Sequence, residues 1–334
     1  MRIPVPLAWF LIALGMFTAG LLRQFHERTP VSPFVSPLVG SLLFAAVVVL
    51  LLVSAREWRR GAVPGRGVRL GSITPILLIV LVEKWVSLNL YNPLFYLVNA
   101  PNVSDDLLDA RYVAFGGVGL LLVTVLVAEF SRPAAAVMRR RAAFSTWPGA
   151  ALATVAVVVA TYAALIAIAR ARGAELRLAW PEATSLIWWI VGGQFVLAFA
   201  EEAYYRGLVL AELHRLAPRL GARSAPARRW TALVASAALF GLEHLRLSAP
   251  AGEILRQALF AGSLAILFGM LVLITDDLHF PAGVHAWINL LLLGAAPRLV
   301  DATGRPALPA GAYVGIALVV AFCAAAWIAR RRRV

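Results

Sequence analysis

Residues 188–207 read WWIVGGQFVLAFAEEAYYRG. An apolar run thus leads directly into two adjacent glutamates, Glu201 and Glu202, with Arg206 in the next helical turn. A charged side chain is costly at bilayer depth, so ionisable residues in such a run indicate a functional site. The stretch therefore predicts a membrane helix that presents two carboxylates and an arginine to the interior of a helix bundle.

The composition indicates that the chain is a membrane protein. Of 334 residues, 61% are hydrophobic and only 14% are charged, whereas soluble domains carry about 25% charged residues. No long polar segment is present to form a separate soluble core, so we predict one all-α, polytopic transmembrane helix bundle. Since a spanning helix needs about 20 mainly apolar residues, about ten spans are expected. They are 6–22, 37–54, 73–98, 112–129, 148–169, 184–213, 230–247, 255–275, 281–297 and 309–328.

The expected spans divide into two groups by their polar content. Residues 1–180 hold about five spans with few polar groups, and the sequence gives them no role. Residues 181–334 hold the remaining spans together with the conspicuous acids, histidines and amides. We therefore expect an N-terminal group of transmembrane helices followed by a catalytic bundle.

The charge pattern predicts the orientation in the membrane. The net charge is +14, and the basic residues form short clusters after even-numbered spans, at 56–69, 132–141, 215–229 and 330–333. Such clusters are typical of cytoplasmic loops and of contact with anionic lipid headgroups, so both termini are predicted to be cytoplasmic. Nucleic-acid binding would need a basic face on a soluble fold and is not expected. Arginine dominance and compact loops favour a prokaryotic inner (plasma) membrane.

Two further residue pairs repeat the four-residue spacing of Glu202 and Arg206. Phe240 precedes His244 by four residues, and His285 precedes Asn289 by four. Residues four apart lie on one face of an α-helix, so three helices would each present polar groups to a common site. Glu201 lies about 100° around the helix from Glu202 and can face the interior separately.

Each polar group also has a structural interpretation. A single membrane histidine can hydrogen-bond a neighbouring helix, and a Glu–Arg pair can be a structural ion bridge. The joint occurrence of all these groups favours a functional site.

Glu201, His244 and His285 are also the ligand types of a catalytic zinc site. The turn with Asp276, Asp277 and His279 is expected to be a solvated loop rather than a metal site. Cys323, the only cysteine, excludes an internal disulfide.

The three motifs resemble those of a known family. Glu201-Glu202-x-x-x-Arg206, Phe240-x-x-x-His244 and His285-x-x-x-Asn289 occur in this order within apolar runs. They are similar to the motifs of the CPBP family of intramembrane glutamic proteases, which are related to type II CAAX-prenyl endopeptidases and to bacteriocin-processing and Abi-like immunity proteins. The resemblance extends from Gln194 to Leu293.

The resemblance implies a glutamate-dependent endopeptidase without a metal or other cofactor. Glu201 would activate water as a general base, with assistance from His244. His285 and Asn289 would stabilise the oxyanion. The supporting residues would be Glu202, Arg206 and Phe240. Substrates would be membrane-associated proteins or peptides, such as prenylated C-termini, leader peptides or sorting tails.

Two other functions compete with proteolysis. A non-proteolytic immunity or scaffold protein would bind a partner through the same cavity, and its activity would survive the changes Glu201→Gln and His244→Ala. A proton-coupled transporter would use buried carboxylates and histidines as a proton relay. The sequence lacks the paired, broken-helix halves that many transporters show.

Overall fold

The computed structural model describes residues 2–3, 68–69, 75–77, 79, 82, 105–130, 132–143, 146–244 and 250–331. The expected spans 6–22 and 37–54, and nearly all of 73–98, lie outside the described residues. Within the described part, five helices are long and apolar enough to cross a membrane: Ala110–Ala128, Trp147–Ala171, Ser185–Leu216, Gly252–Thr275 and Ala310–Arg330. A mostly helical membrane protein is therefore confirmed, whereas a total of about ten spans stays a prediction.

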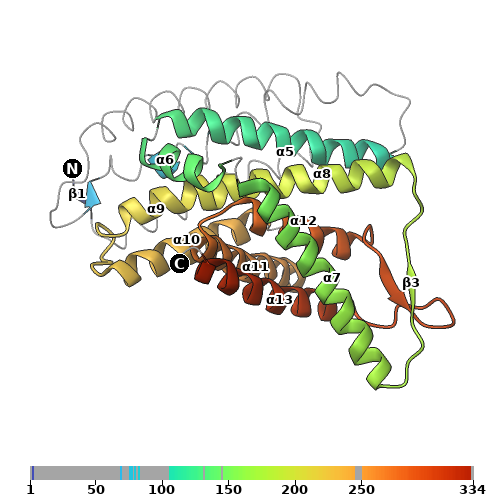
Figure 1. Cartoon of the computed structure of the whole chain (residues 1–334). Coiled ribbons are helices and arrows are strands. Elements are labelled where there is room, and N and C mark those ends of the chain that lie inside the picture. The colour runs from blue at the N-terminus through green and yellow to red at the C-terminus, as the bar shows by residue number, and fades with distance from the viewer. Residues whose placement is uncertain are drawn as a thin grey trace. The chain divides into compact units, whose positions relative to one another are not determined.

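The described part of the chain is mostly helical, and an extended connection that contains β3 joins α7 to α8 (Figure 1). The bounds of the helices are α5 (Asp105–Phe130), α6 (Arg132–Arg141), α7 (Trp147–Ala171), α8 (Ser185–Glu202), the π-helix η3 (Ala203–Val209), α9 (Leu210–Leu216), α10 (Ala225–Glu243), α11 (Ala251–Thr275), α12 (His279–Leu293) and α13 (Ala310–Arg331). Two small antiparallel sheets pair β1 (Arg2–Ile3) with β2 (Val68–Arg69), and β3 (Arg177–Ala179) with β4 (Arg298–Val300).

Two helix ends differ from the expected spans. The helix expected over 230–247 begins at Ala225, because the Ser224 side chain caps it by accepting a hydrogen bond from the Ala227 amide at 3.2 Å. The helix expected over 281–297 ends at Leu293. Gly294 follows it with φ +74°, a left-handed conformation that terminates helices and that glycine adopts without strain.

The chain forms two compact units. The first comprises residues 1–98, 119–139 and 203–269, and the second comprises 99–118, 140–202 and 270–334. The chain passes from the second unit to the first between Glu202 and Ala203, where the α-helix α8 continues as the π-helix η3. The division expected from the sequence, with N-terminal helices over 1–180 and a catalytic bundle over 181–334, stays a prediction.

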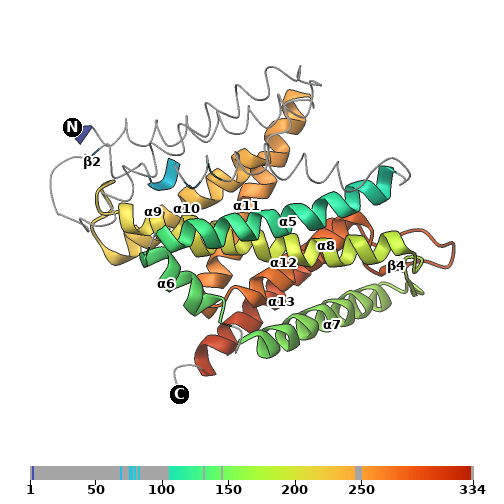
Figure 2. The same ribbon diagram turned by 90° about the horizontal axis from the view of Figure 1, so that it is seen from above.

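In the second unit, α12 is the central helix and contacts α8, α7 and α13 (Figures 1 and 2). Its contact with α7 is close at Gly283, where a Cβ atom would overlap Thr154 Oγ1 and lie 2.9 Å from Thr154 Cγ2. Helix α8 lies equally close to α5, because a Cβ at Gly117 would lie 2.8 Å from the Leu197 backbone. Small residues thus fix the position of α8 and α12.

The segment after α12 is tied to the two flanking helices. The Tyr162 hydroxyl of α7 donates to the Pro297 carbonyl at 2.6 Å. The Leu299 amide of β4 donates to the Tyr313 hydroxyl of α13 at 2.8 Å. The two tyrosine rings also meet edge to face, with centroids 6.1 Å apart. These contacts hold the C-terminal end of α12 between α7 and α13.

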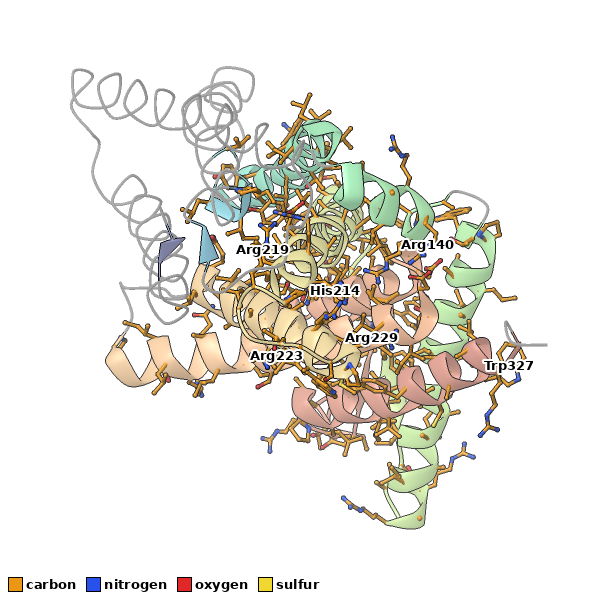
Figure 3. All side chains as sticks on the ribbon, turned by 90° about the vertical axis from the view of Figure 1, so that its left-hand side faces the viewer. Arg140, His214, Arg219, Arg223, Arg229 and Trp327 are labelled. Carbon is orange, nitrogen blue, oxygen red and sulfur yellow. The ribbon has the colours of Figure 1, made fainter. Side chains whose placement is uncertain are left out.

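In the first unit, α10 packs against α9, η3 and α11. A Cβ atom at Gly241 of α10 would lie 2.7 Å from the Ala258 carbonyl of α11, so only glycine permits this approach. The Ser236 hydroxyl donates to the Tyr205 carbonyl of η3 at 3.1 Å. Basic side chains gather around the connection from α9 to α10, where Figure 3 labels His214, Arg219, Arg223 and Arg229.

The turn between α11 and α12 has a structural role, so its interpretation as a simple solvated loop is wrong. Asp277 is only 3% exposed, and its carboxylate accepts a hydrogen bond from the Phe280 amide at 2.9 Å in the first turn of α12. Asp276 pairs with Arg140 at 2.8 Å and with Arg141 at 2.9 Å. Its φ of +50° is unusual for a residue other than glycine.

We expect Asp276→Ala to lower the midpoint of thermal unfolding more than Asp276→Gly does. Both changes remove the ion pairs, but only alanine strains the left-handed backbone, at a cost of roughly 1–2 kcal/mol. The exposed ion pair with Arg140 itself contributes about 0.2–1 kcal/mol. Thermal unfolding of both variants in detergent measures the difference, and equal midpoints would contradict the strain argument.

The same ion pairs should weaken in acid. Partial burial alone would raise the pKa of Asp276, but hydrogen bonds and attraction from Arg141 and Arg140 outweigh it and lower the pKa. The stabilisation is therefore full above the unfolded pKa of about 3.9 and is lost as pH falls through the lower folded value. The gap in thermal midpoint between wild type and Asp276→Gly should close over that acidic range.

Candidate active site

Two adjacent carboxylates of α8 face one histidine of α12 in the second unit. His285 Nδ1 lies 3.0 Å from Glu202 Oε1, and His285 Nε2 lies 3.6 Å from Glu201 Oε2. His285 is buried and Glu202 has no exposed surface, whereas the Glu201 side chain keeps 15% exposure. The last turn of α8 thus places one enclosed and one accessible carboxylate on opposite sides of an imidazole.

The two contacts of His285 differ in chemistry. An ionised Glu202 would only accept hydrogen bonds, so in that state His285 Nδ1 would carry the proton and donate a hydrogen bond to Glu202. The contact with Glu201 is longer than a hydrogen bond. Glu202 therefore orients the imidazole, and Glu201 keeps its oxygens available for another proton donor such as water.

An amide pair lies further along the same two helices. Asn289 follows His285 by one turn of α12, and its Nδ2 donates to Gln194 Oε1 of α8 at 3.0 Å. Gln194 is 7% exposed. Gln194 is not part of the three sequence motifs. A signal was present, because Gln194 is an amide in an apolar run and precedes Glu201 by seven residues, nearly two helical turns.

The remaining motif residues cluster in the first unit. Arg206 is 2% exposed; its Nη2 donates to the Ala265 carbonyl at 3.2 Å, and its guanidinium lies 5.0 Å from the Phe240 ring centroid. Phe240 also contacts the His244 ring, with centroids 4.4 Å apart. The second motif therefore lies directly beside the arginine of the first motif.

His244 caps α10 instead of lying within a helix over 230–247. It follows Glu243, the last residue of α10, and its Nδ1 lies 2.8 Å from the Phe240 carbonyl. Because a carbonyl oxygen only accepts, Nδ1 carries the proton and Nε2 of the neutral ring is an acceptor. An imidazole held in this way can take up a proton at Nε2.

The segment that holds most of these contacts matches a protein family. Residues 183–291 match the family described as type II CAAX prenyl endopeptidase Rce1-like. This range includes every residue of the three motifs. Because of this similarity, residues 183–291 are called the Rce1-like domain. No curated protein and no solved structure matches the chain.

The match confirms the resemblance to CPBP proteases and supports a hydrolase of the protease class. Together with the five apolar helices, the Rce1-like domain indicates an integral membrane protein. The large apolar side chains exposed on these helices, such as Leu126, Leu152 and Val319, are those expected at a lipid-facing surface.

The Rce1-like domain departs from α-helical geometry just after its two glutamates. Residues Ala203–Val209 form a π-helix, in which hydrogen bonds join residues five apart instead of four. The expectation that Glu202 and Arg206 share one face assumed α-helical spacing throughout, whereas Arg206 lies within the π-helix. The pairing of Glu202 with Arg206 itself stays a prediction.

The sequence also offered zinc ligand types in the Rce1-like domain. Within the part of the chain that the structure describes, no three His, Cys, Asp or Glu side chains gather closely enough to hold a metal ion. In the second unit, each of the two glutamates faces a different nitrogen of the same imidazole. This arrangement directs both carboxylates at His285, and a mechanism without a metal stays a prediction from the sequence.

Proposed function

We propose that the protein is an intramembrane endopeptidase that hydrolyses a peptide bond with a water molecule activated by Glu201. The observation that carries the proposal is the imidazole of His285 between an enclosed and an accessible carboxylate, within the Rce1-like domain. General acid–base catalysis requires a carboxylate that substrate and water can reach, and Glu201 meets this requirement better than the fully buried Glu202.

The hydrolysis has two steps. Glu201 removes a proton from water while the water oxygen attacks the peptide carbonyl carbon, and the carbonyl oxygen becomes an oxyanion. The carbon–nitrogen bond then breaks, and the proton held by Glu201 passes to the departing amine. The products are a carboxylic acid and an amine, which exchange a proton to become a carboxylate and an ammonium group, and Glu201 returns to its starting state.

His285 and Asn289 have supporting roles in these steps. Glu202 fixes the imidazole through Nδ1, so Nε2 points toward Glu201, where a protonated ring can donate to developing negative charge. Asn289 contributes an amide donor from the next turn of α12. For His244, we retain the assisting role in proton transfer that the family resemblance implies.

The substrate class follows from the family and the setting. A type II CAAX prenyl endopeptidase acts on prenylated C-termini, so a lipid-modified C-terminal peptide is the first class to test. Membrane-anchored leader peptides and sorting tails are the alternatives. We place the cleaved bond near the cytoplasmic side of a prokaryotic inner membrane, with both termini of the enzyme cytoplasmic, because the arginine clusters follow the positive-inside pattern.

A comparison of membrane proteomes tests the reaction. Membranes containing wild-type protein should yield new protein N- or C-termini that are absent when Glu201→Ala is expressed at the same level. Because the mechanism uses no metal, the same termini should form in the presence of a zinc chelator. Identical termini in both membranes would refute proteolysis and favour the scaffold function, and loss of cleavage with the chelator would favour zinc.

A further inference from the structure

The amide of Asn289 is paired with a residue of α8. Asn289 Nδ2 donates to Gln194 Oε1 at 3.0 Å, between residues 95 positions apart in the chain. Gln194 is buried, and Asn289 is partly exposed. We propose that Gln194 is a positioning residue that keeps the Asn289 N–H₂ group, and not its carbonyl oxygen, directed toward the reacting peptide; this inference rests on the proposed function.

An asparagine side chain requires such a partner to act as a donor. The terminal torsion of an amide is broad and roughly two-fold, so the N–H₂ group and the carbonyl oxygen exchange places at little cost. One orientation donates to an oxyanion, and the other presents an oxygen that repels it. Asn289 Nδ2 has two N–H bonds, and the one that binds Gln194 leaves the other available to the substrate.

The backbone of α8 beside Gln194 is held by close contact with α5. A Cβ atom at the adjacent Gly193 would lie 3.3 Å from the Ala110 carbonyl and from Ala114 Cβ, so the backbone of α8 lies tightly against α5 at this point. Eight residues further along, Glu202 holds His285. Helix α8 therefore orients both polar residues of the third motif, one with a carboxylate and the other with an amide oxygen.

A double-mutant cycle tests this role. Gln194→Met keeps the length of the side chain but removes the acceptor, and it is made in the wild type and in Asn289→Ala. The readout is the rate at which membranes form the terminus that Glu201→Ala lacks. Loss of a single oxyanion donor costs about 10²–10³ in rate. We expect Gln194→Met alone to slow formation of the terminus at least tenfold, and to have no further effect in Asn289→Ala.

Two results would overturn the inference. One is a wild-type rate for Gln194→Met, and the other is an equal loss in both backgrounds, which would indicate a purely structural role. Gln194→Glu is the second variant, because it keeps an acceptor at the same reach; it should retain more activity than Gln194→Met, and the reverse order would also count against positioning. Failure of the proposed function is distinct, since membranes with wild type and with Glu201→Ala would then contain the same termini and no terminus would depend on Glu201.

Discussion

Replacing Glu201 with glutamine is expected to lower the rate of peptide cleavage by a factor of about 10²–10⁴, the usual contribution of a general base. Glutamine keeps the shape of the side chain but cannot take a proton from water. Because Glu201 is partly exposed and lies 3.6 Å from His285 Nε2, its loss removes no short hydrogen bond. The midpoint of thermal unfolding should therefore stay close to that of the wild type.

The neighbouring glutamate is the matched control for this prediction. Glu202→Gln changes the same chemical group one residue away, but Glu202 is fully buried and accepts a 3.0 Å hydrogen bond from His285. Hydrogen bonds to charged groups contribute about 1.5–3 kcal/mol, so this variant should lose stability as well as activity. Cleavage rates and unfolding midpoints of the two purified variants decide the matter. A stable but inactive Glu202→Gln beside an active Glu201→Gln would reverse the two roles.

The second large effect is expected at Gly283, two residues before His285. In Gly283→Ala, the new methyl group would overlap Thr154 Oγ1 and lie 2.9 Å from Thr154 Cγ2. Overpacking of this kind typically costs 1–3 kcal/mol. Helix α12 must move away from α7, and His285 moves with it relative to the carboxylates of α8. We therefore expect lower thermal stability together with a marked loss of cleavage.

Two companion variants make the Gly283 prediction specific. Thr154→Ala removes both overlapping atoms, and its lost hydroxyl makes only a local hydrogen bond to the Ala150 carbonyl of the same helix. The double variant Gly283→Ala/Thr154→Ala should recover most of the stability and activity. Gly192→Ala in α8 is the control for the change of residue type, because a Cβ there meets nothing within 4 Å. Failure of Thr154→Ala to rescue would show that the contact is not the cause.

Hydropathy predicted most of the described helices, because a long apolar run in a membrane protein has few alternatives to a helix. Helix ends were harder, and the start of α10 shows why. Residues 219–229 are rich in arginine, and their polarity suggested a loop. The stronger local signal was Ser224 followed by Pro226, a cap residue and a residue favoured in the first turn.

The motifs indicated which residues belong to the candidate site, but not which residues contact each other. Spacing along one helix predicts neighbours on that helix only. The partner of Glu202 is His285, 83 positions away, and the partner of Asn289 is Gln194. Such pairs depend on how α8 and α12 are rotated against each other, which small residues such as Gly193 and Gly283 determine through close packing. Single-sequence periodicity contains no information on that rotation.

The π-helix has a consequence for the register of the chain. A π-turn holds more residues than an α-turn, so the segment Ala203–Val209 contains surplus length compared with a regular α-helix. Removing one residue there would allow uninterrupted α-helical hydrogen bonding from α8 into α9, because the wider π-turns hold the surplus residue. A related chain whose helix is regular at this place would therefore align with a one-residue gap inside the helix.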